Sequence, residues 1–523
     1  MVGRRITSAS PHPALDLLIA SFLKRFQRLL PVDGIAGLWL VVLVILAQLA
    51  LVGLMAVDWR LSVGVLVGVA LVFLVIERPV LGISLLIMAR LMDTSTNAFI
   101  RIGRTAIGSF ELFLLVALVA MVIHMVRKNR SIFIEWPWLP PLLAFMAFQV
   151  ITLSWSFDRG DGVSEIISMV VVLANAILIL SFVRTPQHFM LVVYAWILAC
   201  VLIGLYSLGA DALGVSDTGP WQAAAGGGRE TGLGQQPNWY AMNLMFIVHT
   251  CLGLALIQKR PLLRWLLLAA GLFIFLNMLR SGSRGATYAI IIGGGMAAMA
   301  LPLFRKWAFR FTLVFVAIFA LGTTLDWGST SQAVTRIWSN VGHTWSTYRA
   351  QNWAVCVEVF VDTWGRGVGA GGYMSVLEKY NWFIYNSDYN YPHGIFWGLL
   401  AHYGIIGLAI FGWIIAAVAR MVRDLAKWTR GTALEIFAWT MPATMVGYLA
   451  WSFVEFEFKE KPFWEFLSLY TALYLMARYA HQNGRTLPQL PGTLTIPWRK
   501  GHRGGPSEGE TETALERTEL PPL

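Results

Sequence analysis

Three arginines placed between long apolar segments carry the first chemical signal in this sequence. Arg280 and Arg284 lie four residues apart in "LRSGSRGATYA", and Arg349 lies in "STYRAQNWA". A guanidinium is permanently charged and donates paired hydrogen bonds to phosphate oxygens. A cluster of such groups therefore suits a diphosphate held without a metal ion. The alternative is that these side chains only reach toward lipid headgroups.

A histidine at the start of an apolar segment carries the second signal. His393 lies in "PHGIFWGLLAHYGIIGL", where a neutral imidazole could accept a proton from a hydroxyl. The alternative is a residue that only caps or packs the start of a helix. His402 follows nine residues later, on the opposite face of the predicted helix and roughly 13 Å along its axis. The two histidines are therefore not expected to share one metal ion.

Acidic and sulfur side chains give weaker signals. Asp158 and Asp161 in "SFDRGDG" could hold a divalent cation, or serve as the solvated turn residues that short loops commonly contain. Cys200, Cys251 and Cys356 are isolated and show neither a disulfide pattern nor a metal-ligand spacing. We interpret the cysteines as packing residues and expect no metal site and no cofactor.

The composition indicates what kind of protein must position these residues. Hydrophobic residues make up 57% of the chain and charged residues 13%, and the mean hydropathy is +0.62. These values are typical of an integral membrane protein. The formal charge of +11 could suggest nucleic acid, but the basic residues form short clusters between apolar runs, as membrane topology requires. Nucleic acid is therefore not an expected partner.

The apolar runs predict an all-α polytopic membrane protein of about 12 to 14 transmembrane helices. The expected spans cover residues 35–56, 61–77, 79–91, 107–126, 136–154, 164–183, 187–208, 238–257, 261–280, 284–304, 308–326, 394–419, 434–456 and 462–480. Few charges lie midway through them.

The basic clusters predict the orientation. "RKNR" (127–130), "QKRPLLR" (258–264), "FRKWAFR" (304–310) and "RMVRDLAKWTR" (420–430) all fall on one side, which the positive-inside rule makes cytoplasmic. Both termini then lie inside. The expected order is a cytoplasmic segment without a cleaved signal peptide (1–34), transmembrane helices (35–326), a periplasmic loop (327–393), transmembrane helices (394–480) and a disordered cytoplasmic tail (481–523).

The long external loop combines an expected amphipathic helix with a glycine cluster. Ile337, Val341, Trp345 and Tyr348 recur at helical spacing, which predicts a helix lying against the membrane or the outer face of the protein. The "GRGVGAGGY" stretch (365–373) permits positive φ and close backbone approach. It is not a phosphate-binding P-loop, because no strand precedes it and no Gly-Lys-Ser follows.

Five motifs in order resemble the O-antigen ligase and Wzy polymerase superfamily of bacterial membrane glycosyltransferases. They are "GQQPNWYAMNL" (234–244), "SGSRGA" (281–286), "RAQNWA" (349–354), "GRGVGAGGY" (365–373) and "PHGIFWGLLAHYGIIGL" (392–408). The resemblance covers about residues 230–410 and implies that Arg284 and Arg349 bind the diphosphate of an undecaprenyl-linked glycan. Arg280 is a further diphosphate-binding candidate from its charge and its position four residues before Arg284. The resemblance also implies that His393 is catalytic. Many members have His-Asn where this chain has His393 and Gly394.

The resemblance implies a metal-independent, inverting transfer of the glycan to an acceptor hydroxyl on the periplasmic face. The acceptor would be lipid A core or a growing polysaccharide, so ligase and Wzy-type polymerase both stay open, as does transfer to protein. A lipid or polysaccharide transporter or flippase is the more distant alternative, since glycine-rich stretches such as "IIIGGGMAAMA" (290–300) also occur in transporters.

Overall fold

The computed structural model describes residues 75–92, 100–102, 105–107, 109–128, 135–212, 236–307, 348–381, 391–455 and 458–485, with 309–310, 313, 385 and 487. The chain divides into two units, Met1–Phe73 and Leu74–Leu523, and every described residue belongs to the second. The expected spans 35–56 and most of 61–77 and 308–326 lie outside the described residues, as do Ile337, Val341, Trp345 and most of the tail.

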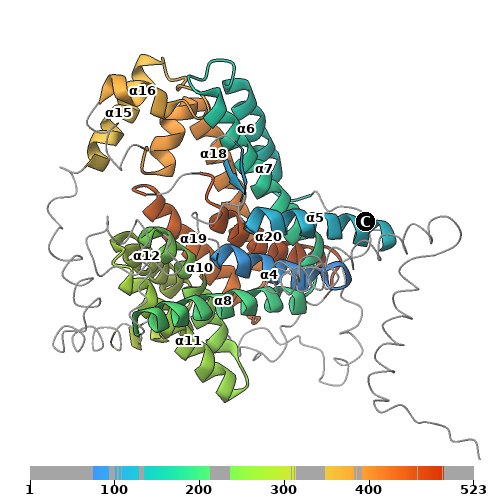
Figure 1. The fold of residues 1–523 in the computed structure, drawn as a ribbon. Helices are drawn as coiled ribbons and strands as arrows, with labels where there is room; N and C mark the ends of the chain where they lie inside the picture. The colour runs from blue at the N-terminus through green and yellow to red at the C-terminus, as the bar shows by residue number, and fades with distance from the viewer. Residues whose placement is uncertain are drawn as a thin grey trace, which may run out of the picture. The chain divides into compact units, whose positions relative to one another are not determined.

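Helices make up nearly all of the described structure (Figure 1). They are α4 (Pro79–Met92), α5 (Ser109–Lys128), α6 (Leu139–Thr152), α7 (Arg159–Phe182), α8 (Pro186–Ala212), α10 (Pro237–Ile257), α11 (Pro261–Arg280), α12 (Arg284–Ala300), α15 (Tyr348–Asp362), α16 (Tyr373–Tyr380), α18 (Ile395–Trp428), α19 (Glu435–Ser452) and α20 (Lys461–Gln482). One short antiparallel hairpin, β1 (Ile100–Ile102) with β2 (Thr105–Ile107), was not predicted.

The all-α polytopic fold is confirmed. Five of the described helices, α7, α8, α10, α11 and α18, are long and apolar enough to cross a membrane. Proline in the first turn of α6, α10, α11 and α20 sets where these helices begin, because it lacks the N–H that a helix start leaves unpaired. Most of the observed bounds follow the apolar windows, but α18 continues to Trp428, nine residues beyond the expected span 394–419.

Glycines let α12 and α19 approach closely. A Cβ atom on Gly293 would lie 2.5 Å from the Ala443 carbonyl oxygen, and one on Gly447 would lie 2.1 Å from the Ala289 carbonyl oxygen. Small residues at such crossings permit backbone contact, which drives helix association within membranes. The "IIIGGGMAAMA" stretch is thus partly a helix-packing surface.

The helix α18 is broken at Gly404, which has φ 59° and ψ −150°. The glycine-rich segment 365–372 fills the break: Val368 N donates to the Ala401 carbonyl at 2.9 Å and Gly369 N to the His402 carbonyl at 2.8 Å. The Gly365 carbonyl accepts from Ile405 N at 3.0 Å. The first part of α18 is therefore a separate short segment, held by hydrogen bonds that the helix itself cannot make.

A buried polar cluster joins four helices. Arg90 of α4 forms an ion pair with Glu465 of α20 and donates to Asn243 Oδ1 of α10 at 2.7 Å, while Asn175 of α7 donates to Glu465 at 2.8 Å. A buried ion pair needs further hydrogen bonds to offset its lost hydration. Both Glu465 oxygens and two Arg90 nitrogens have such partners, whereas Arg90 Nη2 has none among the described residues. The sequence did not predict this cluster, since these residues are far apart in the chain.

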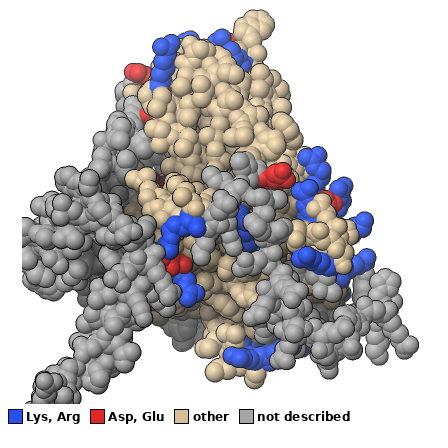
Figure 2. Space-filling model, turned by 90° about the vertical axis from the view of Figure 1, so that its right-hand side faces the viewer, with Lys and Arg blue, Asp and Glu red and all other residues tan. Residues whose placement is uncertain are grey.

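Uncharged side chains dominate one face of the described surface. In the upper part of Figure 2, on the side of α6 and α7, a broad area is free of Lys, Arg, Asp and Glu, and charged residues lie along its top edge. Exposed apolar residues on α6 and α7 include Val150, Ile151 and Val170. An apolar surface of this extent is unusual for a protein in water and fits contact with lipid.

Candidate active site

His393 lies directly before α18 in a conformation that side chains rarely adopt. Its φ is 48°, its residue is 1% exposed, and its imidazole ring lies 3.6 Å from the Tyr391 ring, centroid to centroid. Trp353 of α15 donates its indole N–H to the His393 carbonyl at 3.2 Å. A left-handed backbone costs about 1–3 kcal/mol outside glycine and persists only where its surroundings enforce it.

The charge of Arg349 acts on this histidine. Burial lowers the pKa of His393 most, and the Arg349 guanidinium lowers it further, to about 3. Both effects disfavour the imidazolium. His393 is therefore neutral at physiological pH and can accept a proton. The structure brings together two residues that lie 44 positions apart and that the sequence singled out separately.

Arg349 is held by a carboxylate that the sequence analysis missed. Arg349 forms an ion pair with Glu455, whose side chain is 2% exposed while that of Arg349 is 27% exposed. The expected span 434–456 included Glu455, but α19 ends at Ser452 and Glu455 lies beyond it. An acidic residue at the C-terminal end of an apolar window was the available signal. A guanidinium has five N–H donors, so this ion pair leaves donors for another ligand.

Aromatic rings surround the start of α18. Trp353 stacks on Trp397 with ring centroids 5.4 Å apart and an interplanar angle of 15°. Phe453, just after α19, contacts Trp397 edge-on at 5.3 Å and stacks on Phe396 at 5.6 Å. Phe396 and Phe453 are themselves exposed, but His393 beside them is buried, which strengthens electrostatic effects there.

The residue after His393 must be glycine. Gly394 has φ 151°, and a Cβ atom on it would lie 2.5 Å from the Phe453 carbonyl oxygen. The asparagine that the resemblance leads one to expect at this position would meet backbone that cannot move aside. This chain has glycine in place of that asparagine because the backbone after α19 passes too close to Gly394 for a side chain.

Arg284 and Arg280 flank the turn between α11 and α12. Arg280 ends α11 and Arg284 begins α12, as the sequence predicted, and Ser283 caps α12 by accepting from Ala286 N. Arg284 is half-buried, and no hydrogen bond or ion pair joins it to any residue that the structure describes. Arg280 is also half-buried and has partners.

The end of α19 links this turn to the histidine. A Cβ atom on Gly285 would lie 1.9 Å from Trp451 Nε1, so the "SGSRGA" turn packs directly on that indole. Trp451 lies one turn before Glu455, the partner of Arg349, and Val454 N donates to the Trp451 carbonyl at 2.9 Å. Residues 451–455 therefore contact the "SGSRGA" turn, Arg349 of "RAQNWA" and Gly394 of "PHGIFWGLLAHYGIIGL".

Asp158 and Asp161 form the N-terminal cap of α7. Asp158 caps α7 by accepting from Asp161 N at 3.0 Å, which is the common role of aspartate at a helix start. Within the described ranges, no group of three or more His, Cys, Asp or Glu side chains could hold a metal ion. The three cysteines are free and buried, as expected for packing residues.

The glycine-rich segment also has a structural role. The amides of Val368, Gly369 and Ala370 donate to the Ala401 carbonyl, the His402 carbonyl and the Thr152 hydroxyl. These donors are therefore occupied and do not form a phosphate cradle. His402 contacts the same segment, with its Nδ1 3.2 Å from the Gly369 carbonyl oxygen.

Comparison with protein families identifies part of the chain. Residues 267–412 match the O-antigen ligase family. The matched region contains Arg280, Arg284, Arg349 and His393, and the resemblance inferred from the motifs is confirmed there. No curated protein matches the chain. The chain thus carries the region typical of O-antigen ligases within a multi-pass membrane protein.

Two features of the site lie outside the region that matches O-antigen ligase. Glu455 and Phe453 follow that region, and the "GQQPNWYAMNL" motif precedes it. The sequence did not single out Glu455 and Phe453, because their roles depend on contacts with the distant residues Arg349 and Trp397. The motif alone was a weak signal. In the structure, Gln236 of that motif caps α10 by accepting from Asn238 N at 3.0 Å.

Proposed function

We propose that this protein is a membrane glycosyltransferase that moves a glycan from undecaprenyl diphosphate to an acceptor hydroxyl on the periplasmic face of the inner membrane. The observation that supports it best is the neutral, buried His393 next to the cation of Arg349. The family match supports the reaction class. In this proposal Arg284 and Arg349, with Arg280 nearby, bind the diphosphate, and His393 is the general base.

The leaving group decides what the protein must supply. A diphosphate is a good leaving group, so no general acid is required. Negative charge grows on its oxygens as the anomeric bond lengthens, and arginines already in place stabilise that charge more in the transition state than in the ground state. Glu455 holds Arg349 in position for this task.

The charge of Arg349 also controls the basicity of His393. A pKa of about 3 makes the imidazole a weak base in the free protein. A bound diphosphate would neutralise the Arg349 cation and so raise the pKa of His393. Donor binding would thereby strengthen the base at the moment when the acceptor hydroxyl must lose its proton. Attack from the face opposite the diphosphate inverts the anomeric carbon.

Purified protein tests the activity directly. It is supplied with an undecaprenyl-diphosphate glycan and with lipid A core. We expect ligated lipopolysaccharide and released undecaprenyl diphosphate. Longer lipid-linked glycan without ligated product would indicate the polymerase instead, while glycan translocated into vesicles without any new glycosidic bond would favour the transporter.

The orientation is tested by labelling. Ser375 is exposed on α16. We expect a cysteine at this position, in a background lacking the three native cysteines, to react with a membrane-impermeant thiol reagent in intact spheroplasts. Reaction only after lysis would place residues 327–393 inside and contradict the proposed periplasmic loop.

A further inference from the structure

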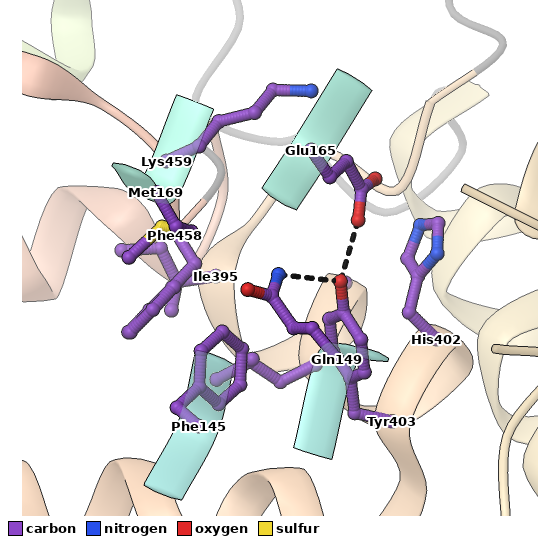
Figure 3. A pocket seen from close by; sticks show the side chains of 11 residues that line it. Phe145, Gln149, Glu165, Met169, Ile395, His402, Tyr403, Phe458 and Lys459 are labelled. Carbon is purple, nitrogen blue, oxygen red and sulfur yellow. Dashed lines mark hydrogen bonds between the residues drawn. The ribbon is translucent and has the colours of Figure 1, made fainter. Parts of the chain in front are cut away.

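A second polar site lies on the other side of the first segment of α18. Tyr403 donates its hydroxyl to Glu165 of α7 at 2.5 Å and accepts from Gln149 Nε2 of α6 at 2.9 Å (Figure 3). These three side chains line a small, partly open pocket with a volume of about 40 Å³. Nothing in the proposed diphosphate chemistry uses this pocket.

The pocket offers hydrogen-bond acceptors. Gln149 is 2% exposed, and its Oε1 atom is buried with no hydrogen-bond partner among the described residues. A buried carbonyl oxygen without a partner costs about 1–3 kcal/mol, so such a group indicates a missing ligand or water. The half-buried Glu165 carboxylate adds acceptor capacity beyond the bond from Tyr403.

The walls and the charge of the pocket select the ligand. Figure 3 shows His402 on one side and the rings of Phe145 and Phe458 on the other, with their centroids 4.4 Å apart. Aromatic faces contact the C–H groups of a sugar, while the acceptors bind its hydroxyls. The Glu165 carboxylate would repel a diphosphate, although Lys459 also lines the pocket. The chemistry therefore fits a neutral polyhydroxylated ligand.

The pocket is lined by the helix segment that directly follows the proposed base. Ile395, Gly398 and Leu399 line it, and they belong to the first two turns of the helix that follows His393. Four residues of helix span about 6 Å, so the Gly398 side of the pocket begins about that far along the axis from Gly394. A glycan held there could present a hydroxyl to the imidazole.

We infer that the pocket formed by Gln149, Glu165 and Tyr403 binds the acceptor glycan through its hydroxyls. This inference rests on the proposed function and adds the site of its second substrate. Donor and acceptor would then be bound on two sides of the chain around His393, the donor by arginines and the acceptor by a carboxylate and an amide.

Initial rates of purified protein, with donor and lipid A core varied separately, test the assignment. Glu165→Gln keeps the oxygen that accepts from Tyr403 but loses the charge. Because hydrogen bonds to charged groups contribute about 1.5–3 kcal/mol, we expect the acceptor KM to rise roughly 10-fold or more, with the donor KM unchanged. Glu358→Gln, at an exposed position on α15, is the matched control and should leave both KM values unchanged.

A second variant and a binding measurement separate this inference from the proposed function. Gln149→Met removes the buried carbonyl oxygen and should also raise the acceptor KM. Saturation-transfer NMR should show contact between wild-type protein and a deacylated, dephosphorylated core oligosaccharide, and the contact should weaken in Glu165→Gln. Oligosaccharide binding without any glycan transfer would support the pocket assignment and contradict the proposed function. Transfer with unchanged acceptor KM in both variants would overturn the pocket alone.

Discussion

The two ends of the first segment of α18 are held in different ways. At Gly404 the break is closed by backbone hydrogen bonds to the glycine-rich segment, and His402 contacts a carbonyl of that segment. At His393 the backbone is equally unusual, but its neighbours are aromatic rings and the Arg349 cation. The Gly404 end is therefore a structural anchor, and the His393 end is an electrostatic site that this anchor keeps in place.

The largest expected effect comes from removing the imidazole at the electrostatic end. His393→Ala should lower the rate of transfer by ~10²–10⁴, the usual contribution of a general base. Initial rates of purified protein with saturating donor and acceptor give the measurement. His481→Ala, an exposed histidine in the last turn of α20, is the control and should transfer normally. A His393→Ala protein with wild-type rate would reduce this histidine to a packing residue.

The anchor end should respond in stability. In Gly404→Ala the new Cβ atom would lie 1.9 Å from the Gly365 carbonyl oxygen, at a φ that side chains rarely adopt. We expect a loss of at least about 1–3 kcal/mol of unfolding free energy, seen as a lower melting temperature in detergent. Gly412→Ala, on the same helix with no neighbour within 4 Å, should be neutral or slightly stabilising. Equal melting temperatures for Gly404→Ala and wild type would show that the break at Gly404 does not act as an anchor.

The pH dependence sharpens the difference between free and donor-bound protein. His393 stays neutral in the free protein down to a pH of about 3, so kcat/KM for the donor should be flat from pH 8 to pH 5. A bound diphosphate raises the pKa of His393, so kcat should fall at a higher pH than kcat/KM does. Matched acid limbs near pH 6.5 in both profiles would show that neither burial nor Arg349 lowers the pKa of His393.

Stability has its own pH dependence at this residue. The pKa of His393 is about 3 in the folded protein and about 6.5 in an unfolded chain, so the unfolded state binds more protons between these values. The neutral histidine therefore contributes stability above pH 6.5 that is lost progressively as the pH falls toward 3. This sign is the one expected for a histidine buried in its neutral form.

The smallest expected effect concerns metal ions. If the arginines neutralise the diphosphate, transfer should survive EDTA. Asp158→Asn should retain most activity, because asparagine caps a helix about as well as aspartate. Asp161→Asn should behave likewise, since it is the backbone N–H of Asp161 that Asp158 binds. Activity lost on chelation and restored by magnesium would discard the arginine clamp.

Periodicity and proline predicted much of the fold. The expected spans 238–257 and 261–280 match α10 and α11 to within one residue, because proline begins each helix where its apolar run begins. Hydropathy could not reveal the break at Gly404, since the residues on both sides are equally apolar and only φ distinguishes them. The hairpin β1–β2 is too short to show a pattern of its own.

The candidate site was predicted in its residues and not in its contacts. Arg349 and His393 stood out by charge and by position before an apolar run, whereas Glu455 became significant only when the chain folded back over 106 positions to meet Arg349. The same is true of the pocket, where Gln149 and Glu165 meet Tyr403 across more than 230 positions. Sequence spacing says nothing about such distant pairs.

In the proposed mechanism Arg349 binds the donor and His393 does not. The affinities of purified His393→Ala and Arg349→Ala for the same undecaprenyl-diphosphate glycan distinguish these two roles. His393→Ala should bind like wild type, while Arg349→Ala should bind roughly 10–100-fold more weakly, because it loses a charge-assisted contact. Arg366→Ala, an exposed arginine beside Trp155, is the control and should bind normally. Equal weakening in His393→Ala and Arg349→Ala, or none in Arg349→Ala, would contradict this division between base and clamp.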